Sequence, residues 1–167
     1  MTGVQTCALP ISLSRLAETC LAAATRRLLA REIAAGKIPG LARDADPAAT
    51  GYVVLAMGKL GAGELNYSSD IDLICLFDQD RHETADFPEV KARLIRVTKD
   101  LVRMIGDQTE AGYVFRTDLR LRPAPSTTPV CIAMEAAERY YESLGRTWER
   151  AAHIKARAVA GDVAGGK

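Results

Sequence analysis

The sequence predicts an α/β domain (α+β in the order of its elements), with a mixed sheet flanked by helices. Three observations predict this class. Two short apolar runs that contain β-branched residues, 51–57 and 70–77, are bounded by turn residues, as buried strands are. Residues 89–108 repeat apolar side chains at three- and four-residue steps, which is typical of an amphipathic helix. Residues 113–122 alternate apolar and polar side chains, which is typical of a half-buried strand.

The first part of the chain divides into two segments. Residues 1–11, MTGVQTCALPI, lack the basic start and long apolar centre of a secretion signal. They resemble the translation of a sequencing-library adapter in frame with a start codon, so we predict a non-native segment there. Residues 12–50 are predicted to form a helix over 13–35, ended by Gly36 and Pro39, and then a polar linker.

The predicted core covers residues 51–133. Its elements follow in this order: a strand at 51–57, a turn at 58–69 with a helical turn near Glu64, a strand at 70–77, a charged turn at 78–88, a helix at 89–108 and a strand at 113–122. Three prolines after Arg122 end that last strand. Residues 134–167 form a C-terminal segment with helical patterns at 134–144 and 147–158, and we expect it to be truncated.

The composition excludes several classes of protein. A chain of 167 residues with 48% apolar content is typical of one globular domain. Its net charge of +1 gives no electrostatic footprint for nucleic acid or for a membrane surface, and charged residues interrupt every apolar stretch. The four cysteines are widely spaced, so neither a disulfide framework nor a zinc site is predicted. We therefore expect a cytoplasmic protein.

Two acids stand at the start of the second strand. Asp70 and Asp72 lie on one face if the strand is regular, with Cα atoms about 6.6 Å apart. Neighbouring carboxylates repel each other unless a cation lies between them, and Mg²⁺ prefers oxygen ligands. Asp118, on the polar face of the strand at 113–122, is a candidate third carboxylate. A lone Asp-x-Asp pair is weak support, because most such pairs are solvated strand ends.

Two further features point to phosphate. Gly58, Gly61 and Gly63 follow the first strand, so the backbone there can approach a ligand closely, although an ordinary glycine turn explains them equally well. Arg116, Arg120 and Arg122 share the polar face of Asp118, where they can neutralise phosphate charge or simply face solvent.

Three ordered segments resemble the glutamine synthetase adenylyltransferase family. They are GKLGAGELNYSSDIDLICLFD, GYVFRTDLRLRP and YYESLGRTWERAAHIKARAVAGD. The resemblance covers residues 51–162 and implies a nucleotidyltransferase fold of the DNA polymerase beta-like type. It also implies a magnesium-dependent enzyme that acts on a tyrosine of glutamine synthetase and so regulates nitrogen assimilation.

The combination of ELNY at 64–67, DLRLRP at 118–123 and GRTWER at 145–150 resembles the adenylyl-removing domain of that family. The resemblance implies phosphorolysis, in which phosphate attacks AMP–tyrosine to give ADP and tyrosine. The partners implied are glutamine synthetase, ATP or ADP, and phosphate. The implied metal ligands and catalytic acids are Asp70, Asp72 and Asp118, and the residues implied at the nucleotide are Gly58, Lys59, Ser69, Arg120 and Arg122.

Alternatives stay open at this point. One alternative to the adenylyl-removing half is the adenylylating half of the same enzyme. The other is a catalytically silent fragment that senses nucleotide or docks a protein. The loop after Pro123 departs from the family, since it reads APSTTP instead of a turn with Gly or Asp. Trp148 is read as helix packing, Cys75 as a buried inert thiol, and Lys155 and Arg157 either face the site or cover a helix.

Overall fold

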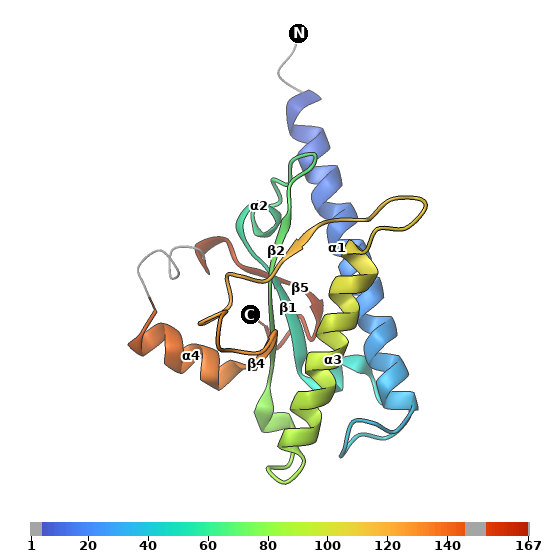
Figure 1. The fold of residues 1–167 in the computed structure, drawn as a ribbon, viewed down its shortest axis with the longest axis vertical. Helices are drawn as coiled ribbons and strands as arrows, with labels where there is room; N and C mark the ends of the chain where they lie inside the picture. Colours follow the sequence, from blue (N-terminus) through green and yellow to red (C-terminus); the bar gives the residue numbers. More distant parts are fainter. Residues whose placement is uncertain (1–4, 146–152, 167) are drawn as a thin grey trace.

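The structure is a computed structural model that describes residues 5–145 and 153–166 (Figure 1). Its helices and strands follow in this order: α1 Gln5–Ala34, η1 Pro47–Thr50, β1 Tyr52–Ala56, α2 Gly58–Gly61, β2 Ile71–Phe77, η2 Gln79–Arg81, α3 Phe87–Gly106, β3 Thr117–Asp118, β4 Cys131–Ala133, α4 Met134–Ser143, η3 His153–Lys155 and β5 Arg157–Gly161. The predicted mixed sheet flanked by helices is confirmed.

The sheet has five strands, with β2 and β1 at its centre. β1 is antiparallel to β2 on one side and to β5 on the other. The other edge of β2 pairs with two short parallel strands, β3 at its first residues and β4 at its last. The antiparallel strands β1 and β2 are joined by the segment that contains α2, whereas the parallel strands β3 and β4 follow β2 after the longer connection that contains α3, as parallel pairing requires.

Two long helices cover one face of this sheet. α1 and α3 lie side by side there (Figure 1), and their apolar residues form the core with every second residue of β1 and β2. The buried side chains of α3 are Val90, Leu94, Val97, Thr98, Leu101 and Ile105, close to the predicted stripe. Because side chains alternate along a strand, Asp72 is on the opposite face from its core neighbours Ile71 and Leu73.

The strand predicted at 113–122 is wrong for most of its length, since only Thr117–Asp118 pair as β3. Before β3, the N–H groups of Val114 and Phe115 both donate to the carbonyl of Ile105 at the end of α3. After β3, the Asp118 carboxylate accepts the N–H of Arg120 and turns the chain. Local hydrogen bonds therefore replace the ladder on both sides.

The helix predicted at 147–158 is also wrong where the structure describes it. Residues 153–155 form a 3₁₀ turn, and Arg157–Gly161 is a sheet strand, so the sheet extends beyond residue 133. Gly161 has a φ of 78°, and a Cβ there would lie 2.0 Å from the carbonyl oxygen of Tyr52. Residues 147–152, including Trp148, lie outside the described residues.

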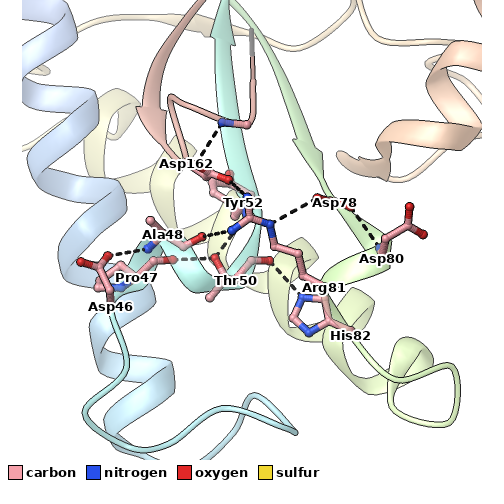
Figure 2. Close-up of polar contacts among 11 residues, drawn as sticks. Asp46, Pro47, Ala48, Thr50, Tyr52, Asp78, Asp80, Arg81, His82 and Asp162 are labelled. Atoms are coloured by element: carbon pink, nitrogen blue, oxygen red, sulfur yellow. Dashed lines mark hydrogen bonds and ion pairs between the residues drawn. The ribbon is translucent and has the colours of Figure 1, made fainter.

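A polar network fixes the C-terminal segment at the far end of the sheet (Figure 2). The guanidinium of Arg81 pairs with the buried carboxylate of Asp162, donates to Asp78 at 3.2 Å and reaches the carbonyl of Ala48. The N–H of Asp162 donates to the carbonyl of Tyr52 at 2.7 Å. β5 is therefore anchored beyond its last residue, at the end of the sheet opposite the acids of β2.

Candidate functional site

The candidate site is built on the parallel pairing of β2 and β3. In this pairing Ile71 is opposite Thr117, and Asp72 is opposite Asp118. Residues in register on adjacent strands point to the same face. Asp118 therefore stands beside Asp72, although 46 positions separate them in the chain, and Asp70 immediately precedes β2.

The charges of these acids interact. The pKa of Asp72 is raised above its ordinary value, mainly by burial and then by repulsion from the carboxylates of Asp118 and Asp70. Arg120 offsets part of this rise by its positive charge. The same arginine acts more strongly on Asp118, whose pKa is lowered below its ordinary value, chiefly by the hydrogen bond from the Arg120 side chain.

Two arginines neutralise the outer acids. The Nε of Arg120 donates to both carboxylate oxygens of Asp118, at 3.1 and 2.8 Å. The Nε of Arg116 lies 2.6 Å from Oδ1 of Asp70. The Arg120 side chain is 84% exposed, so water screens this ion pair. Asp72 lies between these two ion pairs.

The acids suit a hard divalent cation in their chemistry. Carboxylate oxygens are the ligands that Mg²⁺ prefers, and a cation would relieve the repulsion that raises the pKa of Asp72. The side chains are not already assembled around such an ion. Across residues 5–145 and 153–166, no three acidic, histidine or cysteine side chains form a ready metal cluster. Binding one cation to all three acids would therefore require their side chains to move closer together.

The glycine turn lies directly against this site. Gly58 has a φ of +53°, and a Cβ on it would lie 3.0 Å from Oδ2 of Asp72. The N–H of Met57 donates to the carbonyl of Asp72 at 2.9 Å. The helical turn predicted near Glu64 is formed earlier, as α2, and Glu64 closes it by donating its N–H to the Lys59 carbonyl. Only a residue without a side chain fits at Gly58 without displacing the carboxylate.

The other predicted ligand-binding residues are placed differently. Lys59 is exposed on α2, and Ser69 is half-buried in the loop before β2. Ser69 and Arg116 line a pocket of about 270 Å³ beside Asp70, between the first half of α1 and the loops that precede β2 and β3. A ligand held at Asp70 therefore has a concave surface next to it.

The Arg122 side chain forms hydrogen bonds within its own loop. Its guanidinium donates to four carbonyls, those of Leu119, Pro125, Thr128 and Pro129, at 2.7–3.3 Å. It therefore holds together the proline-rich loop whose sequence departs from the family. A contact from Arg122 to phosphate stays a prediction. Among the residues that the structure describes, Arg116 and Arg120 are the two arginines that form ion pairs with these acids.

The position of Arg157 answers a question that the sequence left open. Its guanidinium lies against α2, where it donates to the carbonyls of Leu60 and Gly61. Lys155 extends toward Glu64, with its Nζ 3.5 Å from Oε2. No local pattern could reveal these contacts, because about 90 positions separate the partners.

No helix in the described part of the chain is long and apolar enough to cross a membrane. This finding agrees with the charged residues that interrupt each apolar stretch of the sequence.

Comparison with known proteins identifies the family. The sequence model of the family described as glutamate-ammonia ligase adenylyltransferase matches residues 4–166. The chain belongs to this family. The match starts within residues 1–11, whose adapter origin stays a prediction.

Curated relatives of this family carry the name bifunctional glutamine synthetase adenylyltransferase/adenylyl-removing enzyme. The chain is 52% identical to the one from Mesorhizobium japonicum over 154 residues and 52% identical to the one from Brucella suis over 155 residues. It is 51% identical over 156 residues to the one from a Bradyrhizobium species. These matches cover 92–93% of the chain but 16% of each relative. The chain thus corresponds to a small part of an enzyme of the nucleotidyltransferase class.

Proposed function

We propose that this chain is the adenylyl-removing nucleotidyltransferase domain of a glutamine synthetase adenylyltransferase. In the proposed reaction, an oxygen of inorganic phosphate attacks the phosphorus of AMP–tyrosine on glutamine synthetase. The bond from phosphorus to the tyrosine oxygen breaks, and the products are ADP and unmodified tyrosine. The names of the relatives support the substrate, and the segments 64–67 and 118–123 support the removing half.

The observation that carries this proposal is the pairing of Asp72 with Asp118 beside Asp70. These three acids are the residues that would hold Mg²⁺. When bound, the ion would neutralise charge on the phosphoryl group and on the attacking and leaving oxygens.

The chain's own cationic and backbone groups complete the proposed site. Arg116 and Arg120 already lie on the outer acids, so their guanidinium groups are placed to take phosphate oxygens when the acids take a cation. Gly58 leaves the inner face of Asp72 open. Lys59, on α2, and Ser69, in the loop before β2, are proposed to border the phosphates.

The test is Asp72→Asn in the complete gene product, with phosphate-dependent release of ADP from adenylylated glutamine synthetase as the readout. The substitution keeps the size of the side chain and removes its charge. We expect activity to fall more than about 100-fold, because even outer-shell partners of a metal contribute about 10–100-fold. The control is Asp80→Asn, an exposed acid beyond the other end of β2.

Three results would count against the proposal. Unchanged ADP release in Asp72→Asn would remove the metal-ligand role. ATP-dependent labelling of unmodified glutamine synthetase, without ADP release from the adenylylated form, would assign the adenylylating half instead. Nucleotide binding without either reaction would assign a sensing or docking role.

A further inference from the structure

The C-terminal segment of the chain contacts the last residues of the short helix α2. Arg157, the first residue of β5, donates from Nε to the carbonyl of Gly61 at 3.2 Å and from Nη2 to the carbonyl of Leu60 at 3.4 Å. These carbonyls belong to the last residues of α2; that of Leu60 also accepts the N–H of Gly63 at 2.9 Å. One forked guanidinium therefore contacts both of the last two residues of α2.

Two more contacts join residues 155–157 to α2 and to the turn that follows it. Gly61 is packed so tightly that a Cβ on it would lie 2.1 Å from the carbonyl oxygen of Lys155 and 2.6 Å from that of Ala56. Beyond α2, the Nζ of Lys155 reaches Oε2 of Glu64 at 3.5 Å. α2 is therefore enclosed between the end of β1 and residues 155–157.

Helix α1 orients the guanidinium. The Nη2 of Arg157 forms an ion pair with Oε1 of Glu18, whose side chain is 26% exposed. A charged hydrogen bond with this geometry restricts the rotation of the arginine and directs its remaining donors toward α2. Three segments that are remote in sequence thus meet at one side chain: α1, α2 and β5.

The opposite end of α2 begins at Gly58, which lies against Oδ2 of Asp72. A helix of four residues with no side-chain cap at its start has little stability of its own. Its position, and with it the distance from the Gly58 turn to Asp72, depends on what holds its other end.

We propose that Arg157 is a positioning residue that fixes the Gly58 turn against Asp72, with Glu18 as its orienting partner. This inference rests on the proposed function for its consequence at the ligand. Without the Arg157 fork, α2 tilts or opens, the gap beside Asp72 varies, and a nucleotide–metal complex binds more weakly. Arg157 itself touches neither nucleotide nor metal.

The experiment compares Arg157→Gln with Arg139→Gln in the complete gene product. Arg139 is an exposed arginine of α4 that pairs with Glu135 along its own helix, so it controls for the loss of one surface charge. Two quantities are measured: amide hydrogen exchange of residues 57–65 without ligand, and the dissociation constant of ADP with Mg²⁺ by calorimetry. Melting temperature is recorded for each variant.

We expect Arg157→Gln to raise exchange in 57–65 while exchange in α3 stays the same, and to raise the dissociation constant about tenfold. Glu18→Gln should shift both quantities in the same direction by less, because the amide still accepts a hydrogen bond. Arg139→Gln should change neither.

Two results would overturn the inference. The first is unchanged exchange in residues 57–65, which would mean that α2 keeps its place without the fork. The second is a lower melting temperature with unchanged affinity, which would mean a general structural role. If the unmodified protein binds no ADP with Mg²⁺, the proposed function fails, and the exchange measurement still decides whether Arg157 holds α2.

Discussion

Asp72 and Asp118 lie opposite each other on adjacent parallel strands, and Arg120 acts weakly on the pKa of the first and strongly on that of the second. Arg120 forms a forked ion pair with Asp118 and lowers its pKa, whereas Asp72 keeps a raised pKa because burial and two neighbouring acids outweigh the same arginine. The surroundings of Asp72 therefore disfavour a negative charge more than those of Asp118 do. A site of this kind gains most from a cation placed at Asp72.

The raised pKa of Asp72 predicts a pH-dependent effect of Asp72→Asn on stability. A carboxyl with a raised pKa binds its proton more tightly in the folded protein than in the unfolded chain. Its protonation therefore stabilises the fold at low pH, and this contribution to the free energy of unfolding is lost as pH rises through the folded pKa. Without metal, we expect Asp72→Asn to melt at a higher temperature than the parent at pH 7 and at nearly the same temperature near pH 3. Scanning calorimetry in EDTA measures both. A lower melting temperature for the variant at pH 7 would contradict the conclusion that burial and the neighbouring carboxylates disfavour the charge of Asp72.

Gly58→Ala is predicted to weaken both the fold and the site. The left-handed φ of +53° costs an alanine about 1–2 kcal/mol, and its Cβ would press on Oδ2 of Asp72. Gly63→Ala is a matched control, because Gly63 has a φ of +72° and a Cβ added there would meet nothing within 4 Å. Urea unfolding should show similar losses for both variants, and calorimetry with ADP and Mg²⁺ should show weaker binding for Gly58→Ala alone. Equal affinities would mean that the turn does not border the ligand.

Nucleotide binding is predicted to depend on magnesium. Phosphate oxygens and the carboxylates of Asp70, Asp72 and Asp118 repel one another unless a cation lies between them. In calorimetry, we expect ADP to bind at least about tenfold more tightly with Mg²⁺ than in EDTA, a difference of about 1.4 kcal/mol. Equal affinity in the two conditions would instead indicate a pocket in which arginines alone hold the phosphates.

Arg81→Gln is predicted to destabilise the fold at the end remote from the site. The Asp162 side chain is only 8% exposed, and the substitution leaves its carboxylate without its ion-pair partner, which costs about 1–3 kcal/mol. Arg93→Gln removes an exposed pair with Glu89 and should cost no more than about 0.5 kcal/mol. Urea denaturation of both variants measures the difference. A loss for Arg81→Gln as small as that for Arg93→Gln would mean that the network in Figure 2 contributes little.

The sequence by itself determined the elements whose signal is local. The strands around 52–56 and 71–77 and the helix α3 with its buried stripe follow from periods of two or of three to four residues. The family was also readable from three ordered motifs. Each of these features depends on residues that are close together in the chain.

Only the tertiary structure decided the features that depend on distant partners. β3 is short because hydrogen bonds to Ile105 and Arg120 take up the neighbouring backbone, and Arg157 starts a strand because β1 offers a free edge. The pairing of Asp72 with Asp118, and the contact from Arg157 to α2, join residues that no periodic pattern connects. A hydrogen-bond ladder or a guanidinium contact is set by proximity in space, and proximity appears only after the apolar faces of α1 and α3 have packed on the sheet.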